Sequence, residues 1–517
     1  MAKRYTVNIN RFDGGISEDK RVQAANKYSI TKHFDALTYP HKLVPYAKRE
    51  ASLGVSGQTV DQMKLTRMLY APSGASFKLW GLGDDGAGKL KVFRFDIDGA
   101  SGSLDAVNWV AASNGTSAVG TRQETMFFYY KTFIYMLSGT TSLCRFDTAE
   151  SAAFSDGYQT LATTTTAIQP VLHPTDDVAY FFSDNVVYSL NNVTWNGAVL
   201  TLPSTLRIVA ACPLGNYLAI GCVTTGNLDQ RSIIYLWDRD SSLATLTERV
   251  DMGEGIIIHM ANLNGRLVVV MSLYVNNVLL LGKGKILIKI PNGQIGKTVN
   301  EITVDTAQVA ADFSSSNFVR DNKLYFPCKA TLNSDKRVGI WVVDENGRLT
   351  LDQYDSALET TSSAFKGIYA TANVWWIIYD NGSGLYLITR TDDDNAYDTS
   401  NACIYESLLF TGGDSSKTKK LVGVTVTTEP LPTAGEVILK YRKNVLNADG
   451  TYTAETSWTQ IFDHTTDNSV LHDAVNIESS GATLPQFNEI QFQISSLGGA
   501  VITGLRFDYE EIEDGLY

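Results

Sequence analysis

Two glycine-rich loops carry residue types that could hold a phosphate group. Gly81-Leu82-Gly83-Asp84-Asp85-Gly86 has the spacing of the dinucleotide fingerprint, and Gly282-Lys283-Gly284-Lys285 combines glycines with lysines. The fingerprint needs a following helix whose amino end faces the pyrophosphate. Here Leu90 to Ile97 alternates like a β-strand, and the aspartates would repel phosphate. In the second loop, Ile286 stands where a phosphate loop needs Ser or Thr. We therefore predict a hairpin turn at the first loop, no phosphate loop at the second, and no cofactor.

Residues that ligate metals do not cluster at recognisable spacings. No histidine shares a metal-binding spacing with another His or Cys; the six are His33, His41, His173, His259, His464 and His472. His464 and His472 flank a turn and could meet across a hairpin as a surface pair. The best calcium candidate is Asp392-Asp393-Asp394-Asn395 with Asp398, because clustered oxygen atoms suit a hard cation. A solvated acidic linker explains the same residues, and we assign no metal ligand.

The five cysteines are odd in number and match no metal pattern. Cys212 and Cys222 suggest a disulfide. However, the turn Pro213-Leu214-Gly215-Asn216 would place Cys212 opposite about Tyr217, with Cys222 several residues further along the strand. We therefore expect buried free thiols.

Composition indicates a folded, mostly β protein. The chain has 517 residues, 44% of them hydrophobic, with 25 Tyr, 21 Phe and only 12 Pro. Aromatic and β-branched residues favour strands. The net charge of −12 disfavours a protein that grips DNA, because it repels phosphates at long range. No apolar run reaches the roughly 18 residues of a membrane-spanning helix, and the start lacks a signal-peptide core, so we expect a soluble cytosolic product without membrane insertion.

A strand followed by an acidic or amide residue and a turn recurs along the chain. Clear copies are Val92 to Asp96, Leu143 to Asp147, Val187 to Asn191 and Ile234 to Asp238, and looser copies are Ile288 to Asn292, Ile340 to Asp344 and Tyr386 to Asp392. Successive Asp or Asn positions lie about 44 to 54 residues apart, which is the length of one four-stranded propeller blade. We therefore predict an all-β fold with an about seven-bladed β-propeller.

Apolar runs mark individual strands within the repeats. The runs Phe127 to Tyr130, Val268 to Met271 and Trp375 to Tyr379 lack strict alternation. Continuous apolarity fits inner strands that neighbouring blades cover on both faces.

The two ends of the chain differ from the repeats. Residues 1–62 read as an extended N-terminal arm, in which Ser17 could cap a short helix from Val22 to Ala25. We expect this arm to lie along the propeller or on a neighbouring subunit. Residues 63–399 would form the propeller, and residues 400–517 would give about seven strands of a C-terminal β-sandwich.

Alternating residues support the sandwich. Val437 to Arg442 and Ile490 to Ile494 alternate between apolar and polar side chains. Such alternation is expected for a sheet with one wet face.

Propellers also house glycosidases, which need two carboxylates about 5 to 10 Å apart at the central mouth. The repeated aspartates end a late strand of each blade, where they can cap the backbone amides of turns. The sialidase box Ser-x-Asp-x-Gly-x-x-Trp is absent, since Ala448-Asp449-Gly450 precedes Trp458 at the wrong spacing. We therefore predict no catalytic residues and no enzymatic activity.

The segment from Asn8 to Arg21, Asn-Ile-Asn-Arg-Phe-Asp-Gly-Gly-Ile-Ser-Glu-Asp-Lys-Arg, resembles openings of tailed-bacteriophage structural proteins. The order of arm, propeller and sandwich resembles the tail hub and nozzle proteins of short-tailed phages, including the packaged-DNA-stabilisation type. Several later segments are similar to the closing sandwich of phage tail proteins: Tyr405 to Phe410, Leu439 to Arg442, Trp458 to Ile461, Ile490 to Ile494 and Ile502 to Tyr509. The resemblance in domain order covers nearly the whole chain, but the resemblance in sequence covers only a few dozen residues. No functional residue of those proteins can be assigned to a position in this chain.

This resemblance implies a virion structural protein, a ring-forming tail hub or nozzle subunit around the DNA exit channel, synthesised in the host cytoplasm. Its partners would be other copies of itself, neighbouring tail or connector proteins, and genomic DNA only as a passing strand. The alternative is a host-recognition protein that binds cell-surface glycan with exposed aromatics such as Trp195 or Trp458. A glycan depolymerase is the third possibility.

Overall fold

The computed structural model describes residues 4–17, 26–50, 65–84, 90–95, 109–111, 122–151, 154–225, 230–240, 246–274, 284–304, 316–332, 335–354, 364–370, 375–380, 386–391, 397–447, 449–475 and 485–512. All regular elements in these ranges are β-strands, so the predicted all-β class is confirmed. Within them, no helix is long and apolar enough to cross a membrane. The chain divides into two compact units, a propeller unit (50–347 and 355–391) and a sandwich unit (1–49, 348–354 and 392–517).

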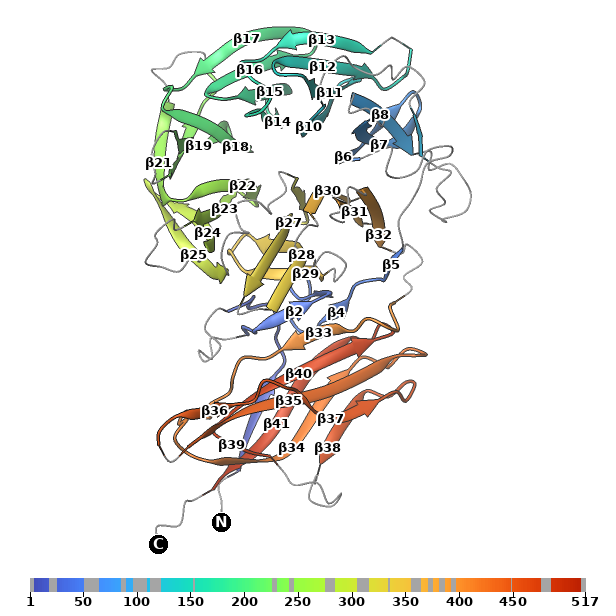
Figure 1. The fold of residues 1–517 in the computed structure, drawn as a ribbon, viewed down its shortest axis with the longest axis vertical. Helices are drawn as coiled ribbons and strands as arrows, with labels where there is room; N and C mark the ends of the chain where they lie inside the picture. Colours follow the sequence, from blue (N-terminus) through green and yellow to red (C-terminus); the bar gives the residue numbers. More distant parts are fainter. Residues whose placement is uncertain are drawn as a thin grey trace. The chain divides into compact units, whose positions relative to one another are not determined.

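Seven blades arranged in a ring form the propeller unit (Figure 1), and the fourth and fifth of them are joined edge to edge into one eight-stranded sheet. Blade 1 holds β6 (Arg67–Ser73), β7 (Ser76–Asp84), β8 (Leu90–Phe95) and β9 (Trp109–Ala111). Blade 2 holds β10 (Arg122–Tyr130), β11 (Phe133–Ser138), β12 (Ser142–Asp147) and β13 (Ser155–Thr160). Blade 3 holds β14 (Ile168–His173), β15 (Val178–Ser183), β16 (Val186–Asn191) and β17 (Thr194–Thr201).

Blade 4 holds β18 (Leu206–Leu214), β19 (Tyr217–Thr224), β20 (Arg231–Trp237) and β21 (Leu246–Glu254). Blade 5 holds β22 (Ile256–Leu263), β23 (Arg266–Tyr274), β24 (Gly284–Asn292) and β25 (Ile295–Val304). From this unit, blade 6 takes β26 (Phe318–Arg320), β27 (Lys323–Leu332) and β28 (Asp335–Asp344), and blade 7 takes β30 (Ala364–Ala370), β31 (Trp375–Asp380) and β32 (Tyr386–Thr391). The ring closes where β30 contacts β6, so the predicted seven blades are confirmed.

The strand of the sequence repeat is the third strand of each blade. The most apolar runs are second strands. Val268 to Met271 lie in β23 and Trp375 to Tyr379 lie in β31, and all of them are buried. Phe127 to Tyr130 lie instead in a first strand, β10, where the two middle residues are only partly buried. The expectation of two-sided burial therefore holds for the second strands.

Each blade places two turns at the same end, which we call the turn rim. Because antiparallel strands alternate in direction, the turn between the first and second strands shares an end with the turn between the third and fourth strands. Asp147 accepts the N–H of Ala149 at 3.1 Å, and Asp344 accepts that of Asn346 at 3.0 Å. The predicted capping role of these aspartates is confirmed.

Two facing sheets form the sandwich unit. One holds β1 (Arg4–Ile9), β41 (Ile502–Glu511), β34 (Lys419–Thr428) and β38 (Leu471–Val475), with β39 (Gln486–Phe487) beside β34. The other holds β2 (Ile30–Lys32), β33 (Cys403–Glu406), β40 (Glu489–Leu497), β35 (Glu436–Leu446) and β36 (Tyr452–Ala454), with β37 (Thr459–His464) beside β35. Phe492 of one sheet packs on Phe507 of the other, with ring centroids 4.8 Å apart.

Smaller elements complete the unit. β3 (Phe34–Asp35) pairs with β4 (Val44–Pro45), and β29 (Leu349–Tyr354) lies in the segment 348–354. β5 (Arg49–Glu50) falls at the boundary between the two units in the sequence.

The N-terminal segment belongs to the sandwich unit, and not to the propeller unit. β1 pairs with β41, with Arg4 opposite Glu510 and Ile9 opposite Leu505, and Tyr5 stacks on Tyr509 at 5.1 Å. The compact units therefore join residues 1–49 to residues 392–517, a division other than the predicted 1–62, 63–399 and 400–517. The helix predicted from Val22 to Ala25 lies outside the described residues.

The expected wet face of Ile490 to Ile494 is wrong, because β40 is buried on both faces. Gln491 donates to the carbonyl of Ser407 at 2.7 Å, and Gln493 donates to the carboxylate of Glu406 at 2.9 Å. Hydrogen bonds thus satisfy polar side chains that alternation alone would place in water.

Candidate functional site

A cavity of about 550 Å³ lies at the centre of the propeller unit. Its wall comes from the first strands of the blades, which carry mostly apolar side chains there. Examples are Met68, Phe127, Val209, Met260 and Tyr369.

Polar side chains in this wall bind the backbone of neighbouring blades. Gln169 of blade 3 donates to the carbonyl of Phe127 in blade 2 at 2.7 Å and accepts its N–H at 3.1 Å. Ser316 accepts the N–H of Ile368 in blade 7 at 3.1 Å. These groups hold blades together, and their hydrogen bonds are directed to protein rather than to a ligand.

The charges in the wall do not provide acid–base chemistry. Arg67 is the sole charged side chain among the described residues that line the cavity, and no carboxylate occurs among them. Beside the cavity, His259 Nδ1 lies 3.1 Å from the side-chain amide of Asn317. Burial, aided by the charge of Arg67, lowers the pKa of His259 to about 3, so this imidazole is neutral at pH 7. Burial also raises the pKa of Cys212, which lines the cavity, to about 12.

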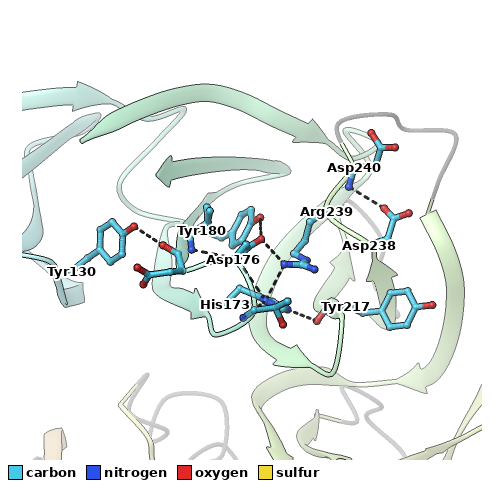
Figure 2. A network of polar contacts seen from close by, with 11 residues as sticks. Tyr130, His173, Asp176, Tyr180, Tyr217, Asp238, Arg239 and Asp240 are labelled. Carbon is cyan, nitrogen blue, oxygen red and sulfur yellow. Dashed lines mark hydrogen bonds and ion pairs between the residues drawn. The ribbon is translucent and has the colours of Figure 1, made fainter. Parts of the chain in front are cut away.

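Charged groups instead join the blades at the turn rim, where they form the network of Figure 2. Arg239 follows β20 and forms an ion pair with Asp176. Its Nη1 also lies 3.1 Å from Nδ1 of His173, whose Nε2 lies 3.2 Å from the carbonyl of Tyr217. Tyr180 donates to Asp176 at 3.3 Å. The first hairpin of blade 3 is therefore joined to two turns of blade 4.

This network resembles an acid–histidine pair in composition but not in geometry. Because Arg239 is always a donor, Nδ1 of His173 accepts and Nε2 donates to the carbonyl of Tyr217. Burial and Arg239 lower the pKa of His173, and the carbonyl of Tyr217 and Asp176 only partly oppose them. Both ring nitrogens are occupied, so His173 has no free lone pair with which to act as a general base.

Similar contacts join other blades at the rim. Tyr130 of blade 2 donates to the carbonyl of Asp177 in blade 3 at 2.5 Å, and Lys131 forms an ion pair with the same residue. Arg94 of blade 1 forms an ion pair with Glu150 of blade 2. The rim is thus a chain of contacts between blades.

All five cysteines are buried and free. Cys212 lies opposite Ala219 rather than Tyr217, and Cys222 lies opposite Ile208. The register differs from the expectation because only two residues, Gly215 and Asn216, form the turn, which places Tyr217 opposite Leu214.

The predicted histidine pair meets, although not at the surface. The rings of His464 and His472 lie 5.5 Å apart, and His472 is buried with Nε2 3.0 Å from the hydroxyl of Thr428. The surface pair is therefore wrong for His472. In the described part of the chain, no group of three or more His, Cys, Asp or Glu side chains could hold a metal ion.

The other predicted motifs are partly described. β7 and β8 form the predicted hairpin, with Asp84 opposite Leu90, while residues 85–89 lie outside the described ranges. Of the calcium candidate, residues 392–395 also lie outside them. Asp398 is described, and its carboxylate accepts the N–H groups of Ser400 and Asn401 at 2.7 and 2.9 Å.

The two tryptophans named as glycan platforms pack against other side chains. Trp195 stacks on Tyr188 with ring centroids 5.6 Å apart and contacts Phe181 at 5.2 Å. The guanidinium of Arg442 lies over Trp458, 4.4 Å from the ring centroid.

Sequence reasoning missed the network of His173, Asp176 and Arg239. Asp176 lies in a hairpin turn, and Arg239 directly follows Asp238, the acidic position of the internal repeat. The repeat itself was the available signal, because residues just after the third strand of one blade meet the first hairpin of the preceding blade.

No protein-family model and no curated protein matches the chain. Among solved structures, the extracellular domain of a hybrid two-component system from B. thetaiotaomicron has 10% identity and a TM-score of 0.39, over 79% of this chain and 44% of that one. The chain thus spans less than half of that domain. The computationally designed protein Ika8 has 13% identity and a TM-score of 0.33, over 63% and 96%. The exo-beta-1,3-galactanase from Phanerochaete chrysosporium, solved with galactose, has 10% identity and a TM-score of 0.28, over 90% and 100%. TM-scores this low establish no shared function.

Proposed function

We propose that the chain is a structural component of a bacteriophage tail, a ring-forming hub or nozzle subunit around the DNA exit channel. The segment from Asn8 to Arg21 and the order of arm, propeller and sandwich both resemble such proteins, and this resemblance supports the proposal. The acidic composition also suits a subunit past which DNA slides, because like charges do not adhere.

The observation that carries the proposal is the contrast between the central cavity and the turn rim. The described wall of the cavity has no carboxylate, whereas hydrolysis of a glycosidic bond needs two. Ionic groups are placed instead where they join blades, as Arg239 and Asp176 do. Such a distribution favours mechanical rigidity over turnover.

Native mass spectrometry, combined with sugar analysis, tests the proposal. We expect the purified chain to form a closed ring, alone or on its connector protein, and to release no oligosaccharide from host polysaccharide. Enzymatic release of oligosaccharide would contradict the structural role.

One observation favours the second candidate, a host-recognition protein that binds glycan. Tyr70 and Phe77 are 42% and 54% exposed, and their rings stack with centroids 5.3 Å apart. Exposed aromatic rings can stack on sugars. Binding of host polysaccharide that the double substitution Tyr70→Ala/Phe77→Ala abolishes would favour this candidate; unchanged or absent binding would count against it.

A further inference from the structure

An apolar pocket opens at the turn rim between blades 4 and 5. Its volume is about 240 Å³, and its walls are aliphatic: Leu214, Leu236, Val250, Leu267, Ile290 and Pro291. Leu214 precedes the first turn of blade 4, and Ile290 and Pro291 precede the second turn of blade 5. The pocket therefore lies at the end of the blades where ion pairs join other neighbours.

Two exposed apolar side chains lie close in sequence to residues that line this pocket. Tyr217 directly follows the turn after Leu214 and is 37% exposed, and Ile295 follows the turn after Pro291 and is 62% exposed. The exposed large apolar residues described in the propeller unit, apart from Val299, all lie within four residues of a turn-rim turn: Tyr70, Phe77, Leu172, Val193, Tyr217, Ile295 and Val319. Only Tyr217 and Ile295 among them lie next to turns whose residues line the pocket, so the pocket with these two side chains is the candidate protein contact.

A cation stands at the edge of the pocket. Arg266 lines it and is exposed, and its Nη1 donates to the carbonyl of Glu345 and to the side-chain oxygen of Asn346, both at 3.2 Å. Both acceptors are neutral, so these two bonds leave the positive charge available to a carboxylate. The site fits a segment that carries an apolar side chain next to acidic residues.

The chain itself contains such a segment. Glu510 and Glu511 end β41, and residues 513–517 then read Glu-Asp-Gly-Leu-Tyr, with two carboxylate side chains, no Lys or Arg, and the apolar pair Leu516 and Tyr517. Charge complementarity with Arg266 and the apolar character of the pocket both favour it as the occupant.

We infer that the pocket between blades 4 and 5 binds the C-terminal segment of a second copy of this chain, with Leu516 or Tyr517 in the pocket and Glu513 or Asp514 at Arg266. The inference rests on the ring assembly proposed above and names the contact that would link its subunits.

Fluorescence anisotropy with a labelled synthetic peptide of residues 510–517 tests the contact. The receptor is the full chain carrying Leu516→Ser and Tyr517→Ser, which removes competition by its own segment. We expect Arg266→Glu to weaken peptide binding about tenfold or more, and Arg249→Glu, at an exposed residue of β21, to change it less than twofold. Because Arg266 is exposed, its substitution should not unfold the chain.

A peptide in which Glu513 and Asp514 are replaced by Lys should regain affinity for the Arg266→Glu receptor. The inference is wrong if the peptide does not bind, or if it binds the wild-type and Arg266→Glu receptors equally.

Native mass spectrometry separates this inference from the proposed function. Rings that survive the Leu516→Ser/Tyr517→Ser substitution would overturn the inference and leave the ring role intact. Loss of rings in that variant and in Arg266→Glu, with a one-to-one dimer when the two variants are mixed, would support both. Peptide binding that depends on Arg266, in a chain that stays monomeric at every concentration, would overturn docking on a second copy together with the ring.

Discussion

Aspartates at the ends of third strands act on the backbone of the following turn. Asp344 accepts the N–H of Asn346 at 3.0 Å, and Asp238 does the same for Asp240 at 3.0 Å, as Figure 2 shows. A carboxylate used in this way stabilises the turns after Asp147, Asp238 and Asp344, and a turn-stabilising role explains why acidic or amide residues recur at blade-length intervals.

Asp344→Ala should lower the free energy of unfolding by about 1 kcal/mol, because it removes a hydrogen bond to a turn amide. Asp344→Asn is the matched control, since its side-chain oxygen can still accept the same N–H. Urea unfolding measures both variants. Equal losses in the two would show that the charge, rather than the hydrogen bond, matters.

Buried neutral histidines make the propeller unit sensitive to acid. The pKa of His259 is about 3 in the folded chain, below its ordinary value of 6.5. As the pH falls below about 6.5, the unfolded chain binds a proton that the folded chain does not, so stability is lost between about pH 6.5 and pH 3. The lowered pKa of His173 acts in the same direction.

His259→Gln should therefore lose less stability than the wild type when the pH falls from 7.5 to 5, by about 2 kcal/mol. Urea midpoints at the two pH values measure this difference, which does not depend on how stable the variant is at pH 7.5. His41→Gln, at an exposed position, serves as the control. The same pH dependence in His259→Gln and the wild type would contradict the linkage.

At the scale of elements, close packing of strands holds the ring closed. A Cβ at Gly367 of β30 would lie 2.6 Å from the carbonyl oxygen of Thr66, just before β6. Blades 7 and 1 therefore approach each other at a position where no side chain fits.

Gly367→Ala should destabilise the propeller unit by about 1–3 kcal/mol, because the backbone must move to admit the methyl group. Gly197→Ala is the matched control, since a Cβ at Gly197 in β17 would meet no atom within 4 Å. Thermal unfolding of the two variants compares them. A melting temperature for Gly367→Ala as high as that for Gly197→Ala would show that the ring is not closed as described.

Local patterns could predict individual blades but not every partner. Alternation of Tyr5, Val7 and Ile9 is present in the sequence, yet the strand that they join, β41, lies near the opposite end of the chain. No local sequence pattern in β1 indicates that it pairs with a strand so far away in the sequence. Gln491 and Gln493 look solvent-facing by alternation, and only their hydrogen bonds to Ser407 and Glu406 explain their burial.

At the scale of the whole molecule, the repeat period was enough to predict seven blades, because each blade must supply similar strands. The cavity was harder to predict, since it is lined by separate segments such as Arg67, Gln169 and Asn317 that are far apart in the sequence. Their spacing along the chain carries no sign of this proximity. The structure thus shows a ring of blades joined by polar contacts at the turn rim, with no carboxylate among the described residues of the cavity wall.

Cryo-electron microscopy of the particle whose genome encodes this chain tests the central claim most directly. The account predicts several copies arranged as a ring in the tail, around a channel whose lining is not strongly basic. Density for the chain as isolated copies on fibres or spikes, or a strongly basic channel, would contradict it.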